Sequence, residues 1–170
     1  VMYYGRGPWE NYQDRKSSTF IDVFNTTVSD FYVPYIRPQE NGNRTDVRWM
    51  ALMDDDEYGL LISSPSQKGL SISALHMPNE AFDITNDLDY SKENKNANFS
   101  KHTTDIKEQN LVQLNIDLAQ RGLGGDNSWG AKPQEKYQLK SNKKHSYSFY
   151  LIPFTSGTLP KFVEFQQQFK

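Results

Sequence analysis

The sequence contains no cysteine, no long apolar run and no excess of charge of one sign. Without cysteine the chain forms no disulfide, no thiolate metal site and no cysteine nucleophile. No segment approaches the roughly 20 apolar residues that cross a bilayer as a helix, so we expect no membrane partner. The 19 basic and 21 acidic residues give a net charge of −2. Nucleic-acid binding normally needs a concentrated basic face, so we expect no nucleic-acid partner either.

The first residues lack the charged start and the apolar stretch of a signal peptide. Apolar residues begin at position 1. We therefore expect the chain to be a piece of a longer polypeptide.

Helical periodicity is also scarce, and alternation of apolar with polar residues replaces it. In LVQLNIDL (111–118) every second residue from Val112 to Leu118 is apolar, which is the period of a half-buried strand. Aromatic residues, 14% of the chain, also favour strands. We expect further strands in residues 18–24, 45–53, 58–63, 69–75 and 145–153.

Many short strands with turn residues between them predict an all-β protein built as an antiparallel β-sandwich. Residues 78–89, which open with proline and carry acidic residues early, are expected to begin one short helix. We expect residues 1–154 to form the sandwich domain and residues 155–170 to form a tail. For the tail, a strand, a helix and an ordered linker remain open.

Several clusters of polar residues have simpler interpretations than a chemical site. The acidic run from Asp54 to Glu57 lacks the alternating ligands of a calcium loop and is expected to be a solvated hairpin tip. His76, His102 and His145 are far apart in the sequence and have no metal-ligand spacing. His76 and His102 each follow a segment that would place them to line a cleft, although a structural or merely exposed role is favoured.

The segment GLGGDNSWG (122–130) places a tryptophan among four glycines. It lacks the Gly-Lys-Ser/Thr of a phosphate loop. One interpretation is a tight connection whose indole folds back into the core. In the other, the glycines carry Trp129 into a sugar pocket as a stacking plate, and Asp126, Asn127 and Ser128 supply polar groups beside it. The residues alone do not decide between the two.

Three long stretches together resemble one family. They are YYGRGPWENYQDRK (3–16), YVPYIRPQENGNRTDVRWMAL (32–52) and LNIDLAQRGLGGDNSWG (114–130). They are similar to the C-terminal domain of bacterial glycoside hydrolase family 2 β-galactosidases, the β-galactosidase small chain. The resemblance covers most of residues 1–152.

The resemblance implies a large antiparallel sandwich like that of galactose mutarotase, here without its first strands. It also implies an upstream (β/α)₈ barrel in which two glutamates hydrolyse the galactoside with retention. Such a barrel needs at least about 200 residues, so the catalytic glutamates are not expected here. For Glu10 and Glu40, and for Arg15, Arg37 and Arg44, we expect scaffolding roles within turns. Glu57 is likewise not expected to be a nucleophile.

In that family the tryptophan of a GGDDSW-type loop is a platform for incoming substrate, and by motif it corresponds to Trp129. This loop has Asp126-Asn127 where the family pattern more often has two aspartates. Candidate substrate contacts are Trp129, Asp126, Asn127 and Ser128 of this loop, together with His102, which is placed to line a cleft. The expected partners are a galactoside and the catalytic barrel, with a homo-oligomer left open.

No cofactor is expected in this chain, although the family commonly uses Mg and Na ions in its barrel domain. Cytoplasmic and periplasmic locations both remain open. Two other functions also stay open. One is a free-standing carbohydrate-binding module, and the less favoured one is an aldose epimerase that uses His76 or His102 with a carboxylate.

Overall fold

A computed structural model describes residues 1–82, 102–127, 129–155, 157–159, 161 and 164. Its regular elements within these residues are eight strands and four short 3-10 helices. The strands are β1 (Met2–Gly7), β2 (Phe20–Asn25), β3 (Arg44–Val47), β4 (Trp49–Met53), β5 (Gly59–Ser63), β6 (Leu70–Leu75), β7 (Gln113–Asp117) and β8 (Tyr150–Phe154). The 3-10 helices are η1 (Ser29–Phe31), η2 (Asn79–Phe82), η3 (Thr103–Asp105) and η4 (Glu135–Tyr137).

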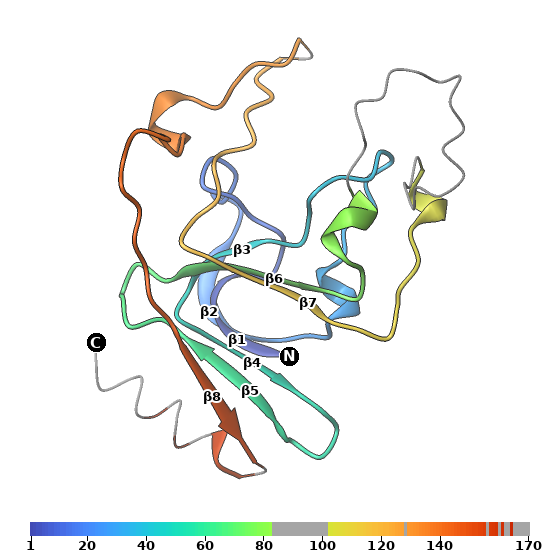
Figure 1. Ribbon diagram of the computed structural model, residues 1–170, viewed down its shortest axis with the longest axis vertical. Coiled ribbons are helices and arrows are strands. Elements are labelled where there is room, and N and C mark those ends of the chain that lie inside the picture. The colour runs from blue at the N-terminus through green and yellow to red at the C-terminus, as the bar shows by residue number, and fades with distance from the viewer. Residues whose placement is uncertain (83–101, 128, 156, 160, 162–163, 165–170) are drawn as a thin grey trace.

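The strands form two antiparallel sheets (Figure 1). One sheet has five strands in the order β2-β1-β4-β5-β8, and the other has three in the order β3-β6-β7. Every described strand pair is antiparallel. The predicted all-β, antiparallel fold class is therefore confirmed.

The stretch 45–53, expected to be one strand, is two strands in different sheets. β3 pairs with β6, whereas β4 pairs with β1 and β5. Near the end of β3, Asp46 has a positive φ of 55°, and the β3–β6 register shifts between Arg44 and Val47. At Arg48 the chain changes partners, because the Arg48 N–H donates to the carbonyl of Tyr4 at 2.8 Å. The sequence hides this break, because Asp46 and Arg48 alternate with Val47 and Trp49 as they would in one continuous strand.

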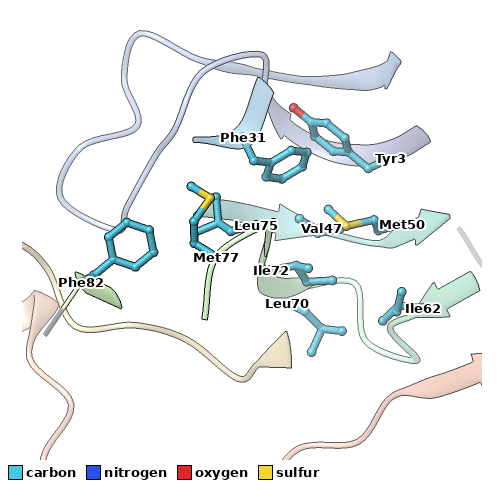
Figure 2. Packing of buried hydrophobic residues seen from close by; sticks show 10 residues of the cluster. All are labelled: Tyr3, Phe31, Val47, Met50, Ile62, Leu70, Ile72, Leu75, Met77 and Phe82. Carbon is cyan, nitrogen blue, oxygen red and sulfur yellow. The ribbon is translucent and has the colours of Figure 1, made fainter. Parts of the chain in front are cut away.

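The main core lies between the sheets and draws residues from both (Figure 2). Tyr3, Met50 and Ile62 come from the five-stranded sheet. Leu70 and Ile72 come from β6, whose six residues are all buried. Burying an aliphatic side chain of this kind contributes about 1.5–3 kcal/mol. This burial positions both sheets and the loops that leave them.

A second, smaller cluster packs around Trp49 on the other face of the five-stranded sheet. Leu61 and Phe154 are buried in it, and Leu159 packs against it. Leu159 therefore places part of the C-terminal segment against the sheet. Most of residues 160–170 lie outside the described residues, so the three alternatives for the tail stay open.

The other elements differ in part from what the sequence indicated. β1 was not among the expected strands. The helix expected to begin at Pro78 starts as the single 3-10 turn η2, and residues 83–89 lie outside the described residues. The acidic run forms the β4–β5 turn, where Asp54 Oδ1 accepts the N–H groups of Asp56 and Tyr58. Among the described residues, no helix has the length and apolarity to cross a bilayer.

Candidate functional site

The candidate loop, residues 122–130, follows β7 and lies outside both sheets. In Figure 1 the orange segment after β7 extends beyond the sheets at one end of the molecule. Gly124, Gly125 and Gly130 have φ angles of 72°, 83° and 81°. Side chains with a Cβ rarely adopt this left-handed region, so the path of the loop depends on glycine.

Asp14 anchors the base of this loop. Its Oδ1 accepts the N–H of Leu123 at 3.0 Å, and its Oδ2 accepts the N–H of Gly124 at 2.9 Å. Burial acts to raise the pKa of Asp14, but hydrogen bonds from the backbone of Gly124, Leu123 and Asp14 itself outweigh it and lower the pKa below its usual value. The carboxylate is therefore charged at neutral pH and makes two charge-assisted hydrogen bonds.

Trp129 stands in solvent, with 92% of its surface exposed. The interpretation in which its indole folds back into the core is therefore wrong. Its backbone N–H donates to Oδ1 of Asn127 at 2.8 Å, which closes a local turn. Tryptophan side chains are usually well buried, so an indole with this much exposed surface is uncommon.

The polar neighbours of Trp129 are placed as follows. Asp126 and Asn127 are exposed on the same loop. The side-chain oxygen of Asn127 accepts the Trp129 N–H and so holds the turn. The side-chain N–H₂ of Asn127 is a further hydrogen-bond donor on the loop. Ser128 lies outside the described residues. The substrate contacts expected of these residues stay predictions.

His102 is exposed and precedes η3 rather than the glycine loop. Its backbone N–H donates to Asp105 Oδ2 at 3.0 Å. The neighbouring Thr103 donates its hydroxyl to the carbonyl of Tyr35 at 2.6 Å, which ties this turn to the segment after η1. In Figure 1 the yellow segment that contains η3 lies well apart from the orange segment that follows β7, so the two candidate segments are not neighbours.

The other two histidines contact backbone carbonyls. Nδ1 of His76 lies 2.7 Å from the carbonyl oxygen of Leu111, and Nε2 of His145 lies 3.0 Å from that of Lys140. In the part of the chain that the structure describes, no group of three or more metal-binding side chains is suitably arranged for an ion.

The motif glutamates lie in a hydrogen-bonded cluster with two tyrosines. Glu10 accepts the N–H of Gly42 at 2.7 Å and a short hydrogen bond from the Tyr35 hydroxyl. The hydroxyl of Tyr12 donates to Glu40 at 2.5 Å. These contacts join the first motif to the second, which is the scaffolding expected of both glutamates.

The same cluster perturbs its titratable groups. Burial, reinforced by the neighbouring charge of Glu40, raises the pKa of Tyr12 well above its usual value. Burial also raises the pKa of Glu40, although the hydroxyl of Tyr12 opposes it. Glu40 as a whole is exposed, but its two carboxyl oxygens are bonded by the Tyr12 hydroxyl and the Gln120 side chain. Tyr12 therefore acts as a permanent donor.

Among the motif arginines, Arg44 is buried and makes the densest contacts. Its guanidinium lies 4.5 Å from the ring centre of Phe31 and donates to the Tyr3 hydroxyl at 3.3 Å and the Gly42 carbonyl at 3.1 Å. Arg15 donates to the Tyr35 hydroxyl at 3.4 Å. Arg37 is exposed, and its carbonyl accepts a side-chain N–H from Gln39.

A family model described as the beta galactosidase small chain matches residues 1–151. The chain belongs to this family. Its curated relatives include beta-galactosidases from Priestia megaterium, 36% identical over 90% of the chain, and from Oenococcus oeni, 36% identical over 88%. A Streptococcus thermophilus beta-galactosidase is 29% identical over 90% of it.

The chain spans only about one eighth of the length of these relatives, 13% of the Priestia megaterium and Streptococcus thermophilus proteins and 12% of that from Oenococcus oeni. The family membership predicted from the three motifs is thus confirmed, and it identifies a small domain of a larger kind of protein.

The residue pattern alone predicts no role for Asp14, although Asp14 lies in the first motif, residues 3–16. Asp14 and the loop it holds are 110 residues apart. No local pattern connects residues at that separation. The one indication in the sequence is that Asp14 and the loop both lie in motifs that carry the family resemblance.

Proposed function

We propose that this chain is a non-catalytic domain of a β-galactosidase. In this proposal it contributes one wall of the substrate site, and Trp129 is the aromatic platform on which the galactoside stacks. The hydrolytic glutamates belong to a barrel domain outside these 170 residues.

The observation that carries the proposal is the exposure of Trp129 on an anchored loop. The indole is 92% exposed, yet the base of its loop is hydrogen-bonded to Asp14. Covering an exposed apolar surface of this size with a ligand lowers the free energy, because it removes the surface from water. A held loop also loses less conformational entropy on binding than a free one.

A pyranose ring suits such a surface. One face of galactose carries C–H groups that pack on an aromatic ring, and its hydroxyl groups need hydrogen-bond partners. Asp126 and Asn127 supply polar groups on the same loop. Lactose and aryl galactosides are the substrates with which we would test this fit.

The decisive test is Trp129→Ala in the β-galactosidase that carries this domain. Loss of the platform is expected to raise KM about twofold to tenfold, because aromatic stacking is worth roughly 0.5–1.5 kcal/mol beyond area burial. Steady-state kinetics with lactose and an aryl galactoside would measure the change.

Trp9→Ala is the matched control, because Trp9 is also a largely exposed indole, at 67%, but lies outside the loop. Its KM should stay that of the unchanged enzyme. If Trp129→Ala leaves KM unchanged as well, Trp129 has no part in substrate binding.

The isolated chain distinguishes this proposal from a free-standing carbohydrate-binding module. A single wall of a pocket buries little of the sugar, so we expect binding no tighter than about millimolar. Titration calorimetry with galactose and lactose would measure it. Micromolar binding by the isolated chain would favour the module instead.

A further inference from the structure

We infer that Asp14 is a positioning residue for Trp129, which rests on the platform function proposed above. Asp14 itself does not contact the sugar. Its carboxylate fixes the base of the loop, and the loop then carries the indole at a defined place beside the substrate.

The carboxylate is the link between the loop and the rest of the domain. Within the described residues, the hydrogen bonds that residues 122–130 make to the first 120 residues are the two accepted by Asp14. The remaining backbone bonds of the loop run to its own continuation, from Gly122 to the Tyr137 carbonyl at 2.7 Å and from Gly125 to the Ala131 carbonyl at 3.3 Å.

Asp14 is itself held in place. It lies in a tight turn closed by two backbone bonds between Tyr12 and Arg15, at 2.9 and 3.1 Å. Tyr12 is 1% exposed and is tied through its hydroxyl to Glu40. The anchor point is therefore fixed to the core by contacts that do not involve the loop.

Two glycines of the loop, Gly122 and Gly124, lie in close contact with their neighbours. A Cβ on Gly122 would lie 2.5 Å from Asp14 Oδ2 and 2.9 Å from Cβ of Tyr137, so only glycine admits so close an approach. A Cβ on Gly124 would lie 2.6 Å from the Ala131 carbonyl oxygen. Gly125 and Gly130 differ, because a Cβ on either would meet open space and only their positive φ angles favour glycine.

The consequence concerns substrate binding more than bond cleavage. Trp129 lies five residues beyond Gly124, and the turn between them is closed by the bonds of Gly125 and Asn127. With its base released, this unit would sample many positions. Each substrate molecule would then have to order the loop before stacking, which raises KM.

The experiment is a double-mutant cycle in the β-galactosidase that carries this domain, using Asp14→Asn and Trp129→Ala. Asparagine keeps the size of the side chain but removes the charge and one of its two acceptor oxygens. Asp14→Asn alone should raise KM by no more than the about twofold to tenfold expected of Trp129→Ala, because it acts through the indole, with a smaller change in kcat. Asp55→Asn, in the exposed β4–β5 turn, is the control and should change neither constant.

In the Trp129→Ala background the effect of Asp14→Asn should vanish, since the residue acts through the indole. Additive effects would overturn the inference, and so would an unchanged KM in Asp14→Asn. In either case a raised KM in Trp129→Ala would still support the proposed function. If Trp129→Ala has no effect, the proposed function fails instead.

Fluorine NMR on the same enzyme labelled with 5-fluorotryptophan tests the anchor without reference to sugar. Replacing Trp9, Trp49 or Trp129 singly with phenylalanine assigns their resonances. Asp14→Asn should shift and sharpen the Trp129 signal and leave that of Trp49, which is 2% exposed in the core, unchanged. An unmoved Trp129 signal would overturn the inference. A change at Trp49 as well would mean a general structural defect and would also count against it.

Discussion

At the scale of single residues, tyrosine hydroxyls hold the two glutamates of the first and second motifs. Tyr12 is buried and donates to Glu40, and Tyr35 donates to Glu10. Glu10 also accepts the N–H of Gly42. A carboxyl group enclosed by protein atoms is costly unless its oxygens are bonded, so these donors stabilise the contact between the two motifs.

Tyr12→Phe should therefore lower the free energy of unfolding by about 1–3 kcal/mol, because it leaves an enclosed acceptor on Glu40 without its donor. Urea denaturation followed by circular dichroism would measure the change. Tyr58→Phe is the control, since Tyr58 is 53% exposed in the β4–β5 turn and should unfold as the unchanged protein does. Equal stabilities for both variants would contradict the role given to the Tyr12 hydroxyl.

At the scale of elements, the junction between β3 and β4 decides the architecture. Asp46 adopts a positive φ there, and its carboxylate binds Arg6 of β1 at 2.8 Å and Lys16 at 3.1 Å. Gly69 packs against the same junction, where a Cβ would lie 2.6 Å from the carbonyl carbon of Asp46. One short segment thus joins both sheets and the turn that presents Asp14.

The pH dependence of stability should report this junction. Burial acts to raise the pKa of Asp46, but the hydrogen bonds and charges of Arg6 and Lys16 outweigh it, so its folded pKa lies below the usual 3.8. A lowered folded pKa gives stability that is present above pH 3.8 and is lost as pH falls through the folded pKa. Urea unfolding at pH 7 and at pH 3 should therefore show a smaller loss of stability in Asp46→Asn than in the unchanged protein.

Asp55→Asn provides the comparison, since it removes an exposed carboxylate at a turn away from this junction. It should lose stability on acidification as the unchanged protein does. If Asp46→Asn follows the same course, Asp46 is not a source of the acid sensitivity.

At the scale of the whole molecule, the five-stranded sheet has an apolar edge. β2 is the outermost strand, and five of its six residues are exposed. Phe20 and Val23 are 57% and 46% exposed. An unpaired, apolar edge strand is a template for pairing with another chain.

The isolated chain should consequently self-associate at high concentration, and Val23→Lys should reduce this, because a charge on an edge strand opposes pairing. Sedimentation velocity over a range of concentrations would measure the association. Asn25→Lys adds the same charge to the same strand without removing an apolar side chain. If it suppresses association equally, net charge is responsible rather than the apolar edge.

Much of this organisation could be predicted from the sequence. Alternation over residues 111–118 correctly placed β7, and the segments 18–24, 58–63 and 69–75 match β2, β5 and β6 to within about two residues. β1 was missed, because its two glycines interrupt the apolar pattern. For residues 145–153 the strand begins only at Tyr150.

The sequence by itself determined the all-β class, the family and the candidate Trp129, since each depends on patterns or motifs that are continuous along the chain. Tertiary structure alone decided that 45–53 belongs to two sheets, that the indole faces solvent, and that Asp14 holds its loop. Each of these depends on which distant backbone groups meet, and hydrogen bonds and burial across some hundred residues leave no periodic trace in the sequence.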